Sequence, residues 1–222
     1  MSVYRYPLGY SLEAEMRRVF AANYVSLVVD VGGHRGQFGS RVRQMGYRAS
    51  IVSFEPGPEV EALRRRAEMD PKWRVVEAAC GAEPDRMTLN VMAGTDFNSL
   101  HVPRAAQGAQ FRGLEVVGHR VVDVVRLDQV LASTFGAERN VFLKSDTQGH
   151  DLEVLRGAEE LWPKVCGVLV EASAIPLYDS APVIEEMIAF MRTKGFVLGG
   201  AFPVSRPHVI VEFDCLFVRD PS

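Results

Sequence analysis

Residues Val28–Gly36 read VVDVGGHRG, and this stretch decides the fold. An apolar strand that begins near Leu27 runs into a glycine turn, and Phe38, Val42 and Met45 then recur at helical spacing. Glycine permits positive φ and lets a ligand approach the backbone closely. The helix that follows presents unpaired N–H groups and the positive end of its dipole. A strand, a glycine turn and a helix in this order are typical of a nucleotide-type binding site.

An acidic residue, Asp30, precedes the glycines, so the pattern is D-x-G-G-x-x-G and not the dinucleotide fingerprint G-x-G-x-x-G. A carboxylate there suits a ligand with a cationic amino group better than a pyrophosphate. A second acid, Glu55, closes the next predicted strand, Ser50–Phe54, where a carboxylate bonds ribose hydroxyls. Together the two acids indicate an adenosine that carries a positively charged amino-acid tail. S-adenosylmethionine fits this description.

The composition is that of one large domain with ample material for a core, since the 222 residues are 47% hydrophobic and 24% charged. The net charge of −3 implies no broad attraction to nucleic acid. The cysteines Cys80, Cys166 and Cys215 are far apart, so neither a disulfide framework nor a zinc site is predicted. Neither a signal peptide nor a membrane-length apolar run is visible, and we expect a cytoplasmic protein.

Strands and helices alternate along most of the chain, which predicts a doubly wound α/β fold with a mostly parallel sheet. Strands are expected at 27–31, 50–54, 73–78, 140–145, 167–171, 196–200 and 209–218, and helices at 37–45, 58–69, 150–161 and 181–194. Asp179 or Ser180 is the expected cap of the last helix, and Gly195 its end. Residues 1–26 are expected to form an N-terminal helical cap, in which a helix that Ser11 caps packs on the sheet edge or covers the site. Residues 27–222 then form the ligand-binding domain.

The segment 84–128 interrupts this alternation between the third and fourth sheet strands and is predicted to be a β-rich insertion. Strands are expected at 87–92, 114–117 and 119–127, with Gly118 as a turn or bulge. Between them lies the irregular loop 93–113, and long irregular loops in compact domains are often functional. Its polar residues Asn98, Ser99 and His101 are expected to reach over the site and contact a substrate.

The second informative stretch is Phe142–Ala158, which reads FLKSDTQGHDLEVLRGA. A buried strand ends in Asp146, turns at Gly149 and enters a helix. Lys144 and Asp146 alternate with apolar neighbours, so both point to the same face. Because ligands bind at the carboxyl ends of strands in open α/β sheets, both side chains are predicted to lie near the mouth of the site. A structural ion pair next to a helix cap is the alternative explanation.

These motifs and their order resemble those of the FkbM-type S-adenosylmethionine-dependent methyltransferases over residues 27–218. The matching motifs are Val29–Gly36, Phe54–Pro56, Arg126–Asp128, and a K-x-D-x-x-G followed by L-x-G-A within 144–158. The resemblance implies the class I methyltransferase fold, a seven-stranded sheet whose last strand is antiparallel. It also implies methyl transfer to a hydroxyl oxygen of a small molecule, namely a sugar, a glycolipid or a polyketide-type natural product.

Carried over residue by residue, the resemblance implies a set of cofactor contacts. Asp30 and the glycines Gly32, Gly33 and Gly36 would hold the methionine end, His34 would shape the pocket, Glu55 would bond the ribose hydroxyls with Pro56 shaping the turn, and Ala79 and Cys80 would lie on the adenine side. Asp146 would lie beside the transferred methyl group. The chain departs from the family at Gln148, where a glutamate is usual, and at Asp151, where a second glutamate is usual.

An alcohol is a poor nucleophile until a base removes its proton or a metal lowers its pKa. The candidate bases are Asp146, His150, His101 and Glu171, and Lys144 joins Asp146 and His150 as a candidate catalytic residue. Asp146 and Glu171 end neighbouring strands in this fold, so they are expected either to bind Mg²⁺ or to act as base and orienter without a metal. Tyr178, just beyond the strand that contains Glu171, is expected to line the acceptor site.

Two other functions stay open. An NAD(P)-dependent oxidoreductase on the same type of sheet is disfavoured by Asp30 and by the lack of an identifiable Tyr/Lys hydride-transfer set. A non-catalytic protein that binds an adenosine ligand is favoured only by Gln148. The expected partners are a small-molecule hydroxyl acceptor and, through the apolar N-terminal helix, a second copy of the chain.

Overall fold

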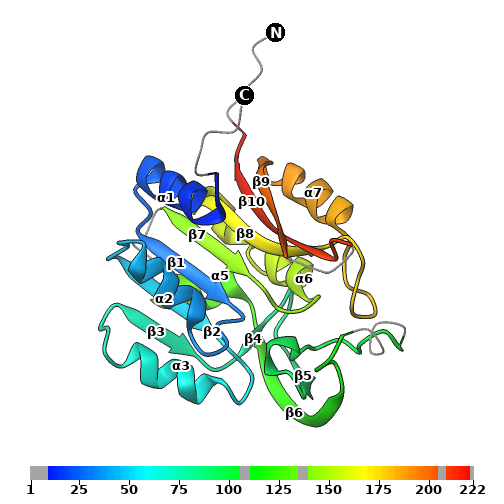
Figure 1. The fold of residues 1–222 in the computed structure, drawn as a ribbon. Coiled ribbons are helices and arrows are strands. Elements are labelled where there is room, and N and C mark those ends of the chain that lie inside the picture. The colour runs from blue at the N-terminus through cyan, green and yellow to red at the C-terminus, as the bar shows by residue number, and fades with distance from the viewer. Residues whose placement is uncertain (1–9, 106–110, 135–139, 205–208, 221–222) are drawn as a thin grey trace.

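The apolar runs of the chain form one seven-stranded sheet. Its strands are β1 (Leu27–Val31), β2 (Ser50–Phe54), β3 (Trp73–Val76), β7 (Val141–Ser145), β8 (Val165–Ser173), β9 (Phe196–Val204) and β10 (Glu212–Arg219). They lie in the order β3-β2-β1-β7-β8-β10-β9 (Figure 1). β10 is antiparallel to both of its neighbours, whereas β3, β2, β1, β7 and β8 pair in parallel. The computed structural model describes residues 10–105, 111–134, 140–204 and 209–220.

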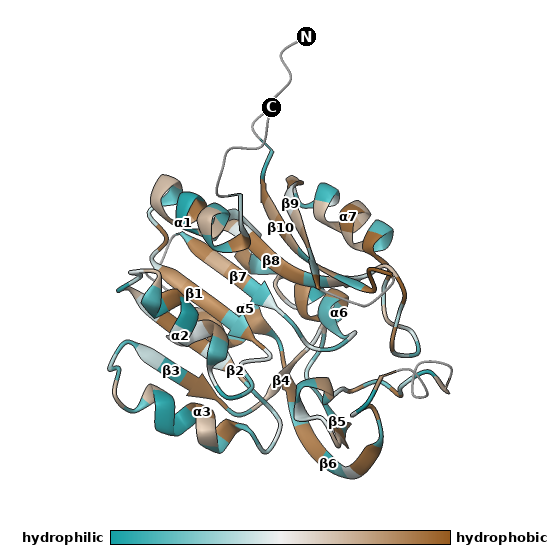
Figure 2. Cartoon of the chain, viewed as in Figure 1, coloured by the Kyte–Doolittle hydropathy of each residue, from teal (hydrophilic) through white to brown (hydrophobic). Residues whose placement is uncertain are grey.

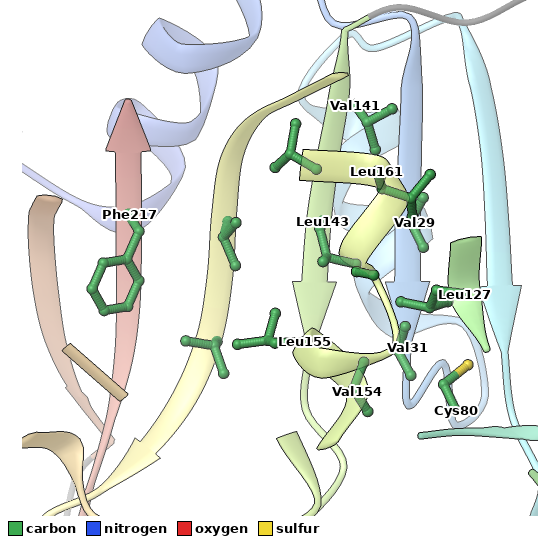
Figure 3. Close-up of a cluster of buried hydrophobic side chains, with 14 of the residues drawn as sticks. Val29, Val31, Cys80, Leu127, Val141, Leu143, Val154, Leu155, Leu161 and Phe217 are labelled. Carbon is green, nitrogen blue, oxygen red and sulfur yellow. The ribbon is translucent and has the colours of Figure 1, made fainter. Parts of the chain in front are cut away.

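Helices cover both faces of this sheet, as the doubly wound prediction requires. α1 (Leu12–Asn23), α2 (Gln37–Gln44) and α3 (Val60–Ala67) pack on one face, and α5 (Leu127–Thr134), α6 (Asp151–Arg156), the 3₁₀ helix η2 (Glu159–Lys164) and α7 (Ile184–Thr193) pack on the other. Alternate residues of β1 serve the two cores: Val28 contacts the first layer, and Val29 and Val31 the second (Figure 3). The strands are therefore mostly apolar, and Figure 2 shows hydrophilic segments near the carboxyl ends of β1 and β7.

The strand–turn–helix order around β1 and β2 matches the prediction, and both strands have the predicted bounds. Ser11 caps α1 as predicted, because its side-chain oxygen accepts a hydrogen bond from the N–H of Ala14 at 3.2 Å. α1 packs over the end of the sheet that is formed by β8, β10 and the edge strand β9. Its buried Met16 and Val19 share a core with Leu169 of β8 and Leu216 of β10, so the helix lies across the sheet face.

The helices differ from the prediction in three respects. α5 was not predicted, because its short apolar pattern directly follows an apolar strand and looks like a continuation of that strand. The predicted helix 150–161 is split into α6 and η2 at Gly157, where a Cβ would lie 2.0 Å from the carbonyl oxygen of Gly81. The residue that caps α7 is Val183, not Asp179 or Ser180.

The insertion forms a second, three-stranded sheet. Its elements are β4 (Ala79–Cys80), β5 (Asp85–Met92), the 3₁₀ helix η1 (Thr95–Phe97) and β6 (Val116–Val125), with the strand order β4-β6-β5. The two strands predicted after residue 113 are one strand, and Gly118 lies at its bulge, where the pairing shifts from Val91–Gly118 to Met92–Val116. Ala79 and Cys80 pair with β6 and do not extend β3.

α2 packs closely on β3 at Gly39. A Cβ at Gly39 would lie 2.2 Å from the ring of Trp73, whose indole N–H is held by the Ser53 hydroxyl at 3.0 Å. Alanine normally stabilises a helix interior by about 1 kcal/mol relative to glycine, but overpacking costs about 1–3 kcal/mol. We expect Gly39→Ala to lower the free energy of unfolding by about 1–2 kcal/mol in urea titration. Gln44→Ala, on the exposed side of the same helix, is the control, and a stabilised Gly39→Ala would contradict this packing.

Candidate functional site

A cavity of about 300 Å³, here called the site cavity, lies at the carboxyl ends of β1, β2 and β7. The predicted site residues that line it are Gly32, His34, Glu55, Pro56, Ala79, Cys80, Asn98, Ser99, Asp146, His150 and Glu171. A second cavity of about 310 Å³ shares Gly32, His34, Asp146 and Glu171 with it and is also lined by Gly33 and Lys144. Among the residues predicted for the site, all of them described, Asp30, Gly36, His101 and Tyr178 line neither cavity.

The glycine turn presses β1 against the end of β7. Gly32 has a φ of 74°, and a Cβ at this position would lie 1.8 Å from the carbonyl oxygen of Asp146. The amides of Gly32 and Gly33 donate to the carbonyl of Phe54 at 3.0 and 2.9 Å, which ties the turn to β2 as well. Only glycine satisfies both the dihedral and the contact, so the floor of the site cavity is bare backbone.

Asp30 lies behind this turn and lines neither cavity, so its expected direct contact with a ligand gains no support and stays a prediction. Its carboxylate is fully buried, accepts a hydrogen bond from Ser53 at 2.8 Å, and pairs with the Lys144 ammonium at 3.1 Å. Burial raises the pKa of Asp30, and the charge of Lys144 opposes that rise. In the structure Asp30 holds the side chains of Ser53 and Lys144 in place.

Lys144 binds the backbone of the same turn. Its ammonium donates to the carbonyls of Val31 and Gly32 at 3.2 and 2.8 Å, beside its pairing with Asp30. Burial would lower the pKa of Lys144, but the charges of Asp30 and Asp146 hold it above its ordinary value. The structure therefore contains the ion pair that was the alternative explanation for Lys144, and its catalytic role stays a prediction.

Glu55 ends β2 inside the site cavity, 5% exposed. Its carboxylate accepts hydrogen bonds from the N–H groups of His34 and Gly57, both at 2.7 Å, so its orientation is fixed. Burial raises the pKa of Glu55, and these two hydrogen bonds oppose the rise. Beside it, Ala78, Ala79 and Cys80 present small side chains that leave room for a flat ring.

The insertion covers the site cavity from above. The His34 ring nitrogen Nε2 lies 3.0 Å from the hydroxyl of Thr95, and Ser99 donates to the carbonyl of Gln148 at 2.7 Å. Asn98 donates to Glu59, at the start of α3, at 3.1 Å. These contacts support the expectation that 93–113 reaches over the site for the described part of that loop.

Tyr178 contacts this cover and lines neither cavity. It is 1% exposed, and its hydroxyl lies 2.9 Å from the carbonyl oxygen of Phe97 and 3.0 Å from the side-chain oxygen of Gln148. The helix-entry loop folds its ring into the apolar cluster with Met92 and Leu114, so a place for Tyr178 in the lining of the acceptor site gains no support and stays a prediction.

His150 and His101 form a pair between α6 and the insertion. His101 Nε2 lies 3.1 Å from His150 Nδ1, and His150 is buried in the wall of the site cavity. Burial, with a smaller contribution from His101, lowers the pKa of His150 to about 4. Burial also lowers the pKa of His101. The pair is therefore neutral at neutral pH, and one ring donates to the other.

Sequence reasoning missed two acids at the junction of the cavities. Glu212 of β10 lines the site cavity, and Asp214 lines the second cavity directly across from Glu171 on β8. Burial, then the charges of Asp146 and Glu212, raise the pKa of Glu171 well above its ordinary value. Glu212 and Asp214 are two residues apart at the start of a strand, a spacing that places both side chains on one face of the sheet. The sequence does not show that β10 pairs antiparallel with β8, and this pairing brings the two acids to the site.

In the described part of the chain, His, Cys, Asp and Glu side chains do not gather in groups of three or more that could hold a metal ion. The expected Mg²⁺ site at Asp146 and Glu171 thus gains no support. The same part of the chain contains no helix with the length and hydropathy needed to span a membrane.

The sheet order, the single antiparallel strand and a cavity at the ends of β1, β2 and β7 define a class I methyltransferase fold. The profile of the Methyltransferase FkbM domain matches residues 30–198. The chain belongs to the FkbM methyltransferase family and is an S-adenosylmethionine-dependent methyltransferase. This assignment agrees with the resemblance in the motifs and disfavours both the oxidoreductase and the non-catalytic alternative.

Relatives with curated names support the assignment. Methyltransferase sdnD of Sordaria araneosa is 28% identical over 193 residues, which cover 76% of this chain and 73% of the relative. Methyltransferase 1 of Beauveria bassiana is 27% identical over 195 residues, 82% of this chain and 75% of the relative. The solved magnesium protoporphyrin IX methyltransferase of Synechocystis PCC 6803, with bound SAM, superposes with a TM-score of 0.52 at 11% identity, over 94% of this chain and 78% of that one, and shares the fold.

The buried ion pair makes a prediction about stability. Lys144→Met keeps the length of the side chain but leaves the Asp30 carboxylate buried without its partner. We expect a loss of about 3–5 kcal/mol in the free energy of unfolding, measured by urea titration. Asp30→Asn/Lys144→Met removes both charges and is expected to recover most of the loss. A double variant as unstable as the single one would show that the pair is not what stabilises the turn.

The neutral histidine pair makes a prediction about pH. The pKa of His150 is lower in the folded chain, so its contribution to stability is complete above the unfolded pKa of 6.5 and is lost as the pH falls toward 4. Between about pH 7.5 and about pH 5 this loss is about 2 kcal/mol. We expect His150→Gln to lose less stability than the wild type over this range. His119→Gln, at an exposed position on β6, is expected to follow the wild type.

Proposed function

We propose that this enzyme transfers the methyl group of S-adenosylmethionine to a hydroxyl oxygen of a small molecule. The observation that carries the proposal is the junction of two cavities of about 300 and 310 Å³ at Asp146 and Glu171. Two cavities that meet at a pair of carboxylates provide one space for the methyl donor, one for the acceptor, and oxygen acceptors for a proton where the two spaces join.

The residues of the site cavity fit the methyl donor. Glu55 has a fixed carboxylate for two ribose hydroxyls, the small residues Ala79 and Cys80 leave room for the adenine, and the bare backbone at Gly32 admits the methionine end. S-adenosylmethionine supplies a methyl group activated by its sulfonium charge. The insertion is held over the cavity by the contacts of Thr95 and Ser99.

The chain itself then has to hold the acceptor and take its proton. We assign the orientation of the acceptor hydroxyl to Asp146 and the acceptance of its proton to a carboxylate oxygen of Glu171. Asp146 suits the first task because its side chain is 41% exposed and follows the end of β7, whereas Glu171 is deeper on β8. The second cavity combines the apolar residues Leu12, Phe38, Leu169 and Val204 with charged ones such as Arg41 and Asp214, which suits an acceptor with an apolar body and polar substituents, such as a natural product of the polyketide type.

The proposal is tested first by calorimetric titration with S-adenosylhomocysteine and, separately, with NAD. We expect the first to bind and the second not to bind. An acceptor screen with labelled S-adenosylmethionine follows, in which each sugar or polyketide alcohol is paired with its own O-methyl ether. Transfer to the alcohol but not to the ether supports O-methylation, whereas transfer only to amines or thiols refutes it.

Replacement of the orienting acid separates chemistry from cofactor binding. We expect Asp146→Asn to lower kcat by about 10²–10⁴-fold, because a positioned carboxylate is lost, while the Kd for S-adenosylhomocysteine stays near the wild-type value. Asp123→Asn, at an exposed position on β6, is the matched control. Unchanged turnover in Asp146→Asn would remove this residue from the mechanism.

A further inference from the structure

Gln148 lies between the two carboxylates that the proposed function uses. Its side-chain nitrogen is 3.1 Å from Oδ1 of Asp146 and 2.8 Å from Oε2 of Glu171. On the other side, its side-chain oxygen accepts a hydrogen bond from the Tyr178 hydroxyl at 3.0 Å. A neutral amide thus joins the end of β7 to β8 and to the cover of the site cavity.

The orientation of this amide is set by its neighbours. With oxygen and nitrogen exchanged, the Gln148 oxygen would face two carboxylates and the amide nitrogen would face a tyrosine hydroxyl, so two acceptor–acceptor contacts would replace two donor contacts. The backbone is held as well, because the carbonyl of Gln148 accepts the Ser99 hydroxyl at 2.7 Å. The residue also adopts a φ of 54°, which the rigid turn imposes.

Two carboxylates on neighbouring strands repel each other unless a proton, a cation or hydrogen-bond donors lie between them. The Gln148 amide supplies one N–H to each carboxylate and adds no charge. Of these two carboxylates, Lys144 contacts Asp146 alone, at 3.7 Å from Oδ2. Its ammonium group also donates hydrogen bonds to the carbonyls of Val31 and Gly32 in the glycine turn. The amide is therefore the group that bridges Asp146 and Glu171, in the position where a divalent cation would bridge two carboxylates.

We propose that Gln148 is a positioning residue that takes the place of a bridging cation, so that Asp146 and Glu171 act on the acceptor as a metal-independent pair. This inference rests on the proposed function for its chemical meaning. The geometry of the Gln148 bridge does not depend on the proposed function, since the bridge exists without an acceptor. Glutamate at this position has the same length and would present a third carboxylate to the same space, which turns the bridge into a site for a hard cation.

The first experiment measures Mn²⁺ binding by electron paramagnetic resonance in the full chain. We expect Gln148→Glu to gain a Mn²⁺ site that the wild type lacks, and Gln148→Glu/Glu171→Gln to lose it again. Gln129→Glu adds the same charge at an exposed position of α5 and is expected to bind as little as the wild type. A wild type that binds Mn²⁺ as tightly as Gln148→Glu would overturn the proposal, and so would a Gln148→Glu that gains no site.

The second experiment observes the bridge directly in the unmodified protein. We expect the side-chain amide resonances of Gln148, assigned by their absence in Gln148→Glu, to shift in both Glu171→Gln and Asp146→Asn. Resonances that stay at solvent-exposed values in the wild type would show that the amide does not bridge. Neither experiment requires methyl transfer, so a failure of O-methylation and a failure of the bridge are separate results.

Turnover supplies the functional readout once an acceptor is found. We expect Gln148→Met, which keeps the length of the side chain but donates no hydrogen bond, to lower kcat by about 10-fold or more with KM near the wild-type value. Gln148→Glu is expected to show turnover that rises with added Mg²⁺, whereas the wild type shows none of this dependence. A wild type stimulated by Mg²⁺ to the same degree would contradict a metal-independent pair.

Discussion

The buried ion pair between Asp30 and Lys144 is the constraint on which the site depends. The two residues are register partners on β1 and β7, the neighbouring parallel strands at the centre of the sheet. Their contact, with the Lys144 hydrogen bonds to the carbonyls of Val31 and Gly32, sets where both strands stop. Because the glycine turn follows the end of β1 and Asp146 follows the end of β7, this one pair of charges fixes two walls of the site cavity.

The sheet was largely predictable because its strands are apolar runs that alternate with helical patterns, and β1 and β2 have the predicted bounds. Whether the Asp30 side chain points into the ligand cavity or into the protein interior could not be predicted from the sequence. Both faces of a doubly wound sheet are covered, so alternation does not tell which face holds the ligand. α5 was missed for a related reason, since its apolar residues continue an apolar strand. Glu55 and Asp146 were found because strand ends carry ligands in this fold.

The part of the site that sequence reasoning could not assemble comes from segments far apart in the chain. Glu212 and Asp214 reach the junction only because β10 inserts antiparallel between β8 and β9. The contacts of Tyr178 could not be predicted, because its ring packs in a cluster with Met92 and Leu114 of the insertion and its hydroxyl contacts the carbonyl of Phe97. Gln148, first noted as a departure from the family, becomes intelligible only when the distances to two carboxylates and one tyrosine are known.

The cover over the site cavity has a consequence for the order of events in a catalytic cycle. It is fastened at three places that belong to the glycine turn, to the start of α3 and to the loop after β7. These contacts lie over the site cavity, whereas the second cavity also borders on α1 and α2 through Leu12 and Phe38. With the donor and the acceptor divided between the cavities as proposed, opening of the cover would act on exchange of the donor before it acts on exchange of the acceptor.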